Sequence, residues 1–333
     1  MENKNKKTRL NSPVESDSTF VKDIQITRSS RLHGYWSRHW ALYAMLVLPL
    51  IFFFIFSYLP MINILLAFTQ NNIITPILEL IAEGGWVGMA NFERAFGMIP
   101  FREAIRNTLM FSILDLVVGF PAPIILALLL NELKRERFKK ITQTISYMPH
   151  FLSWVIVGGL TVQLFSQDTG VINTVIVNMG GEPFPFLTDN LNWTITNVLV
   201  AVWRSIGWNT IIYLAAITNV SPELYEAADM DGASRLRKMW HVTLPGIRPV
   251  IITLFTLTLG GIMGADLARF MAMDNNLVRG VAQVIPTYIY RWGLQGFNYS
   301  LGTAINLFQS IIGLTLILTG NWFVKKLGGN GFW

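Results

Sequence analysis

Long apolar runs separated by shorter polar segments dominate the chain from about residue 41 onward. A helix needs about 20 mainly apolar residues to cross a bilayer, and six stretches approach or exceed this length. The candidate spans are 41–68, 105–130, 143–165, 194–217, 249–265 and 303–324. The first is too long for the apolar core of a signal peptide, and no small-residue cleavage site follows it. The pattern predicts an all-α, polytopic membrane bundle of about six transmembrane helices.

Composition agrees with a membrane protein and excludes several other classes. Of the 333 residues, 52% are apolar and only 14% are charged, whereas a soluble domain carries about 25% charged residues. The chain is therefore not an ordinary soluble enzyme, a disordered protein or a nucleic-acid-binding protein. It has no cysteine and only four scattered histidines, so we expect neither disulfides nor a metal site.

The basic residues predict how the chain is oriented. Nineteen of the 26 lie in segments 1–40, 131–142 and 218–248 and after the sixth span, whereas the alternate loops hold five. Such an asymmetry places the basic segments in the cytoplasm, so both termini are predicted to be cytoplasmic. The net charge of +6 is then a signal of topology and requires no nucleic-acid partner. Residues 1–39 are polar and are predicted to form a cytoplasmic tail ahead of a transmembrane domain over 40–333.

The loop at 218–249 is unusually long for a membrane bundle. Ser221 is a good N-cap, Pro222 suits the first helical position, and Gly232 can end the helix in a left-handed conformation. A second short helix is predicted to start just after this glycine and to end before Pro245. The loop is either a structural connector or a docking surface for a soluble partner, and its two-helix design favours docking.

Polar and aromatic residues inside the spans or in the aromatic outer segment 283–302 are candidates for a substrate path. They are Asn107, Asp115, Trp203, Arg204, Trp208, Asn209, Tyr213, Tyr288, Arg291 and Asn306. Each could instead serve helix packing, and the outer aromatics could form an interfacial belt. Asn209 and Tyr213 share a helix face. Asp115 and Arg204 could pair with each other, or Arg204 could face an acidic substrate.

Several catalytic motifs are missing from the chain. It contains no G-x-x-x-x-G-K-[ST], G-x-S-x-G or H-E-x-x-H sequence, so it lacks a phosphate-binding P-loop and common hydrolase signatures. Energy for transport must come from another subunit or from an ion gradient. An ion-coupled secondary transporter predicts inverted repeats and midplane carboxylates, but only Asp115 lies within a span and no repeat is evident. A membrane-embedded hydrolase is opposed by the lack of a recognisable nucleophile–base constellation in the sequence.

Specific motifs resemble one family. Glu226-Ala227-Ala228, followed by Asp231-Gly232-Ala233 and Leu244-Pro245, resembles the EAA motif of permease subunits of bacterial ABC importers. The Gly88, Asn91-Phe92 and Asn107-Thr108-Leu109 elements are similar to those of carbohydrate permeases of the maltose type. The stretch 287–294 and the terminal Phe332-Trp333 are similar to the oligosaccharide branch, which includes alginate and aldouronate permeases. Segment 266–273 departs from the run usual in that branch.

The resemblance implies a type I ABC importer permease fold and a non-catalytic transport role in the bacterial inner membrane. The helix at 223–230 would insert into an ATPase subunit. The residues that the motif assigns to this coupling are Glu223, Tyr225, Glu226, Ala227, Ala228, Asp231, Gly232, Ala233, Leu244 and Pro245. The implied partners are a homologous second permease, two ATPase subunits that bind ATP and Mg, and an extracytoplasmic solute-binding protein. No cofactor is expected on this chain. The implied cargo is an oligosaccharide, and a uronate-containing one would give Arg204 a role.

Overall fold

The computed structural model describes residues 39–70 and 85–326. Within these ranges the regular structure consists of helices joined by loops, together with one isolated bridge between Thr69 and Trp86. The predicted tail before residue 39 and the terminal Phe332-Trp333 lie outside the described residues. The chain divides into two compact units, Met1–Ile62 and Asn63–Trp333. The predicted all-α fold is confirmed.

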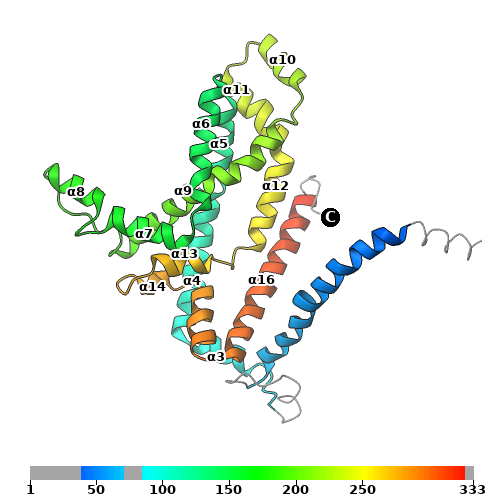
Figure 1. Cartoon of the computed structure of the whole chain (residues 1–333), viewed down its shortest axis with the longest axis vertical. Coiled ribbons are helices and arrows are strands. Elements are labelled where there is room, and N and C mark those ends of the chain that lie inside the picture. The colour runs from blue at the N-terminus through cyan, green and yellow to red at the C-terminus, as the bar shows by residue number, and fades with distance from the viewer. Residues whose placement is uncertain (1–38, 71–84, 327–333) are drawn as a thin grey trace, which may run out of the picture. The chain divides into compact units, whose positions relative to one another are not determined.

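The first unit contains the helix that starts at His39 and includes the π-helical turn η1 (Phe54–Tyr58). This helix continues into η2 (Leu59–Phe68). The long helices of the second unit are α4 (Ile99–Leu114), which runs through η3 (Asp115–Gly119) into α5 (Pro121–Asn131), then α9 (Asn190–Ile217), α12 (Leu244–Gly260) and α16 (Tyr299–Lys326). The shorter helices are α3 (Ala90–Gly97), α6 (Glu136–Tyr147), η4 (Met148–Phe151), α7 (Trp154–Phe165), α8 (Val171–Asn178), α10 (Pro222–Met230), α11 (Arg235–Lys238), η5 (Met239–Thr243), α13 (Leu267–Met273), α14 (Arg279–Ala282), α15 (Ile285–Tyr288) and η6 (Ile289–Gln295) (Figure 1).

Five of the predicted spans correspond to continuous helices long and apolar enough to cross a membrane. They are His39–Phe68, Ile99–Asn131, Asn190–Ile217, Arg235–Gly260 and Tyr299–Lys326. The predicted third span over 143–165 corresponds to a bent pair of helices, because Glu136–Phe151 and Trp154–Phe165 meet at 105°. Taken as one broken span, the pair brings the count in the described residues to six. Leu152 is extended at the bend, and the Ser153 hydroxyl caps the new helix by accepting a hydrogen bond from the Ile156 amide.

The fifth span also differs from the prediction. Helix α11, η5 and α12 form one continuous helix from Arg235 to Gly260, so no short helix ends before Pro245 and the span does not reach 265. A proline inside a helix removes one amide donor and crowds the preceding turn. The wider π-helical turn η5 precedes Pro245, and similar turns precede Pro60 and Pro121. The helix therefore accommodates Pro245 by widening rather than by stopping.

Three buried clusters hold the second unit together, and the α4–α5 rod contributes to each. Near its middle, Phe111 packs edge-to-face on Trp193 and Phe270, with ring centroids 5.8 and 4.8 Å apart. Toward its start, Phe101 packs in a cluster with Tyr288 of α15. The third cluster joins α5 to α9 and α12. One rod thus connects the elements that surround the site.

Helices α6 and α9 approach each other closely at Gly207. A Cβ atom at this position would collide with the Ser146 backbone carbonyl. Glycine is therefore required for the two backbones to come this near. The contact fixes α6 against α9 just before the bend at residue 152.

Candidate functional site

Helix α10 lies at one end of the second unit, between α9 and α11 (Figure 1). Pro222 occupies its first turn, and Ser221 is at the N-cap position but makes no side-chain capping bond. The helix ends in a Schellman arrangement, in which the Ala233 amide donates to the Ala228 carbonyl at 2.9 Å. Gly232 has φ +70°, which confirms the predicted left-handed termination.

Two side-chain contacts fasten α10 to the helix that follows it. The Tyr225 hydroxyl donates to Thr243 Oγ1 at 3.0 Å, and Lys238 Nζ lies 2.7 Å from Asp229 Oδ1. Both contacts are made with the segment that runs without interruption into α12. The two contacts therefore join α10 to a helix that is long and apolar enough to cross a membrane.

The outward face of α10 is apolar and acidic. Met230 is 89% exposed and Leu224 is 53% exposed, and the carboxylates of Glu223 and Glu226 are also exposed. Exposed apolar groups with a charged border are typical of protein interaction surfaces. The remaining residues of the motif have different surroundings. Ala227, Asp231 and Pro245 are exposed, Ala228 and Ala233 are partly buried, and Leu244 packs on the α5–α9–α12 cluster.

A cavity of about 540 Å³ that contains several polar and charged groups lies between α5, α9 and α12. Four of the predicted path residues line it, namely Asp115, Arg204, Asn209 and Tyr213. The predicted shared face of Asn209 and Tyr213 is confirmed by their common cavity. Sugar hydroxyls bind such groups by exchanging hydrogen bonds with amides and hydroxyls.

The suggested pairing of Asp115 with Arg204 is wrong. Asp115 Oδ2 instead accepts from Arg269 Nη1 at 2.6 Å, and Arg269 Nε donates to Asn197 Oδ1 at 2.8 Å. Arg269 is 5% exposed. A buried guanidinium requires such partners, because desolvating an unpaired charge is costly. The pair neutralises one cation of the cavity.

Arg204 has a different environment. Its Nε donates to the Leu152 carbonyl at 3.1 Å, and its guanidinium carbon lies 4.7 Å from the centroid of the Trp154 ring. Within the described residues its two terminal NH₂ groups make no hydrogen bond. The nearby Asp266 carboxylate accepts from the Trp154 indole and from the backbone amides of its own helix start. Arg204 is thus the cation in this cavity that retains free donors.

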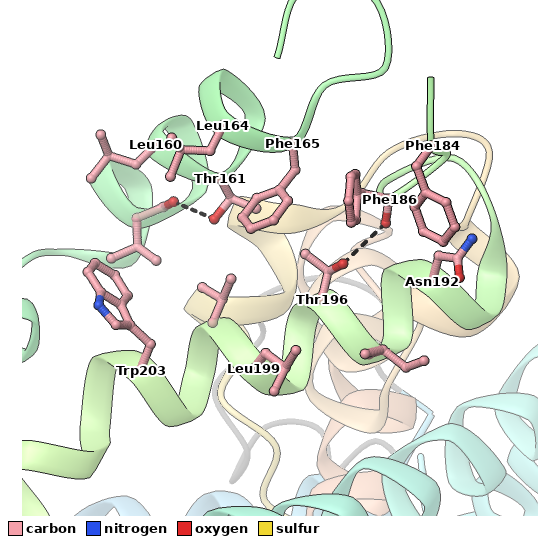
Figure 2. A pocket seen from close by; sticks show the side chains of 13 residues that line it. Leu160, Thr161, Leu164, Phe165, Phe184, Phe186, Asn192, Thr196, Leu199 and Trp203 are labelled. Atoms are coloured by element: carbon pink, nitrogen blue, oxygen red, sulfur yellow. Dashed lines mark hydrogen bonds between the residues drawn. The ribbon is translucent and has the colours of Figure 1, made fainter. Parts of the chain in front are cut away.

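The other predicted path residues lie elsewhere. Trp203 lines a second cavity of about 520 Å³ together with Leu160, Leu164, Phe184 and Phe186 (Figure 2). The hydroxyls in this cavity are already bonded: Thr161 donates to the Val157 carbonyl and Thr196 to the Phe186 carbonyl. The cavity therefore suits an apolar group rather than a sugar.

The remaining candidates serve structure or face outward. Asn107 is buried and its amide donates to the Gly280 and Gln283 carbonyls at 2.7 and 2.9 Å. Trp208 stacks on His150 with centroids 4.5 Å apart, and Arg291 pairs with Asp274. Asn306 is exposed.

Tyr288 is fully buried, and its hydroxyl donates to Met98 Sδ. Burial raises the pKa of the Tyr288 hydroxyl, and Arg94 partly opposes this rise. This residue belongs to the core rather than to an aromatic belt.

Arg269, Asp266 and Trp154 line the cavity as well, and no sequence motif points to them. Arg269 comes just after the predicted fifth span, 249–265, and so falls outside every predicted span. Asp115 was the available signal, since a carboxylate within a span needs a cationic partner. Among the described residues no group of three His, Asp or Glu side chains could hold a metal ion.

Comparison with known proteins gives consistent matches. The family described as "Binding-protein-dependent transport system inner membrane component" matches residues 119–328. Protein LplB of Bacillus subtilis (strain 168) is 43% identical over 290 residues, which cover 87% of this chain and 90% of LplB. The polygalacturonan/rhamnogalacturonan transport system permease protein YteP of the same organism is 43% identical over 292 residues, covering 88% and 90% of the two chains.

Solved structures agree with these sequence matches. A chain of a bacterial ABC transporter involved in the import of the acidic polysaccharide alginate aligns with a TM-score of 0.81 and 38% identity, covering 89% of this chain and 99% of that one. A chain of a bacterial alginate ABC transporter in complex with an alginate pentasaccharide-bound periplasmic protein gives a TM-score of 0.82 and 37% identity, covering 90% and 99%.

Proposed function

The chain belongs to the family of binding-protein-dependent transport system inner membrane components, and from this membership we propose how it acts in its transporter. It is a non-catalytic, membrane-spanning permease subunit of an ATP-binding cassette importer for sugars. Family membership removes the ion-coupled alternative, because such importers are driven by ATP. The proposal concerns the coupling residues, the cargo, the partners and the orientation.

Helix α10 is the element on which the ATPase acts. The observation that carries this proposal is the continuity of α11, η5 and α12, together with the bonds from Tyr225 and Asp229 to that helix. The exposed Leu224 and Met230 supply an apolar contact, and Glu226 supplies a charge for basic groups of the ATPase. Closure of the ATPase dimer would tilt α12 and open the cavity alternately to the two sides.

The cargo is an acidic oligosaccharide. This proposal is supported by the relative YteP, a polygalacturonan/rhamnogalacturonan permease, and by the two similar transporters of known structure, which handle alginate, an acidic polysaccharide. The free NH₂ groups of Arg204 offer a charge-assisted site for a uronate carboxylate. Asn209 and Tyr213 in the same cavity can bind hydroxyl groups.

The proposed assembly contains four kinds of subunit. This chain pairs with a homologous permease to form the translocation path, and two ATPase subunits bind ATP and Mg. A solute-binding protein outside the membrane delivers the sugar. Both termini and α10 face the cytoplasm.

Charge reversal at Glu226 and a helix-incompatible residue at Gly232 test the coupling role. Glu226→Lys and Gly232→Pro should abolish uptake and sugar-stimulated ATP hydrolysis in the assembled transporter, with the permease still present in the membrane. Glu182→Lys reverses an exposed charge in the segment after α8 and serves as the matched control, which should transport normally. Wild-type uptake and ATPase stimulation in both coupling variants would refute the role of α10.

A further inference from the structure

Helix α6 has an unusual distribution of apolar side chains. Phe138, Ile141, Ile145 and Met148 recur at spacings of three and four and therefore form one stripe along the helix and its last turn. Their exposed fractions are 55%, 57%, 63% and 64%. A stripe of this kind facing away from its own bundle requires an apolar environment.

The rest of α6 packs inside the protein. The inward side carries the partly buried residues Thr142, Gln143, Ser146 and Tyr147, and it rests on α9 at Gly207. The polarity of α6 is thus inverted relative to a helix on the surface of a soluble protein. The outward stripe belongs to none of the three buried clusters of the described unit.

Cations are concentrated where this helix begins. They are Lys134, Arg135, Arg137, Lys139 and Lys140. None of the five forms an ion pair within the ranges that the structure describes. Glu132 and Glu136 lie in the same stretch, which leaves a net charge of +3 over residues 132–140.

The basic loop at 218–248 differs, because one of its cations is paired and it also carries carboxylates. There Lys238 pairs with Asp229, and the carboxylates of Glu223 and Glu226 are close in sequence. The loop that bears α10 is therefore a mixed-charge surface suited to a protein. The start of α6, in contrast, carries more cations than carboxylates, and these cations lie next to the apolar stripe.

We propose that this α6 surface, formed by the four exposed cations Lys134, Arg135, Arg137 and Lys140 and by the four apolar side chains, binds an anionic phospholipid of the inner leaflet. The cations hold the headgroup phosphate, and the acyl chains lie along the stripe. Basic clusters next to a membrane segment attract anionic lipids, and the attraction grows with each Lys or Arg near the membrane surface. An amphipathic helix places its apolar side chains among the acyl chains. The leaflet follows from the proposed orientation, but headgroup selectivity can be measured without it.

Spin-labelled phospholipids test the site on the transporter assembled with its partner subunits and reconstituted in phosphatidylcholine. Wild-type protein should retain spin-labelled phosphatidylglycerol in preference to spin-labelled phosphatidylcholine. The variant Arg135→Gln/Arg137→Gln/Lys140→Gln should lose that preference by roughly tenfold or more. Lys325→Gln/Lys326→Gln removes two exposed cations at the end of α16 and should leave the preference unchanged.

The apolar half of the surface has its own variant. Ile141→Ser/Ile145→Ser should weaken retention of both labelled lipids equally, because the acyl chains do not differ between them. An unchanged phosphatidylglycerol preference in the triple variant would overturn the proposal. Loss of a partner subunit from the purified complex, with lipid preference unchanged, would also overturn it and would identify the surface as a protein interface.

Discussion

Two guanidinium groups line the same cavity and have opposite surroundings. Arg269 is buried and bound to Asp115 and Asn197, so its charge is used inside the protein. Arg204 is held by one carbonyl and one aromatic face, so its charge remains available. At the scale of single residues, recognition of an acidic sugar depends on this difference.

Replacing Arg204 should impair recognition of the substrate's negative charge without disabling the transport mechanism itself. Arg204→Gln removes a charge-assisted hydrogen bond worth about 1.5–3 kcal/mol, so uptake of uronate oligosaccharides at low concentration should fall roughly tenfold or more. Arg204→Lys retains the charge and should restore part of the uptake. Radiolabelled uptake over a range of substrate concentrations provides the measurement, and unchanged uptake in Arg204→Gln would contradict the assignment.

The partner of Asp115 could not be read from the sequence. Asp115 and Arg269 are 154 residues apart in the chain, and no periodicity relates them. From the sequence, Arg204 is one cation that could pair with Asp115, because it lies within the predicted span 194–217. The structure brings α13 back toward η3, and only this return makes Arg269 the partner. Membership of Asn209 and Tyr213 in one cavity was predictable, because a spacing of four residues defines one helix face.

At the scale of elements, the contact between α6 and α9 depends on a residue without a side chain. Gly207→Val would place side-chain atoms on the Ser146 backbone carbonyl. Overpacking of this kind costs about 1–3 kcal/mol, and here the obstacle is backbone, which cannot rotate away. The variant should melt at a lower temperature in detergent and yield less monodisperse protein.

Gly159→Val is the matched control for this substitution. Gly159 also lies within a helix, but no atom occupies the space that its Cβ would take. The control should melt close to wild type, as measured by tryptophan fluorescence or a thermal shift assay. Equal melting temperatures for the two variants would show that the close approach of α6 and α9 contributes little to stability.

Local rules predicted some element boundaries and not others. The end of α10 was predictable, because Gly232 has the conformational freedom that the termination requires. The bend between η4 and α7 was not, because segment 143–165 is apolar enough overall to read as one span, although its backbone turns by 105°. At Pro245 the sequence predicts a helix end that does not occur, because the π-helical turn before this proline keeps the helix continuous.

The orientation of the whole molecule can be tested with single cysteines, because the chain contains no cysteine of its own. Met230 and Met179 are 89% and 83% exposed and are predicted to lie on opposite sides of the membrane. In intact cells a membrane-impermeant maleimide should label Met179→Cys and spare Met230→Cys until the membrane is permeabilised. The reverse pattern would invert the proposed topology and place α10 away from the ATPase.

The central claim is that ATP hydrolysis by partner subunits, acting through α10, drives import of an acidic oligosaccharide through this permease. The direct measurement is ATP hydrolysis by the transporter in proteoliposomes, with its solute-binding protein loaded with a uronate oligosaccharide, with a neutral oligosaccharide, or with no sugar. Hydrolysis should rise above the basal rate with the uronate-loaded protein alone and should be accompanied by sugar uptake. Failure of the permease to assemble with the ATPase, or hydrolysis that is indifferent to the loaded sugar, would contradict the account.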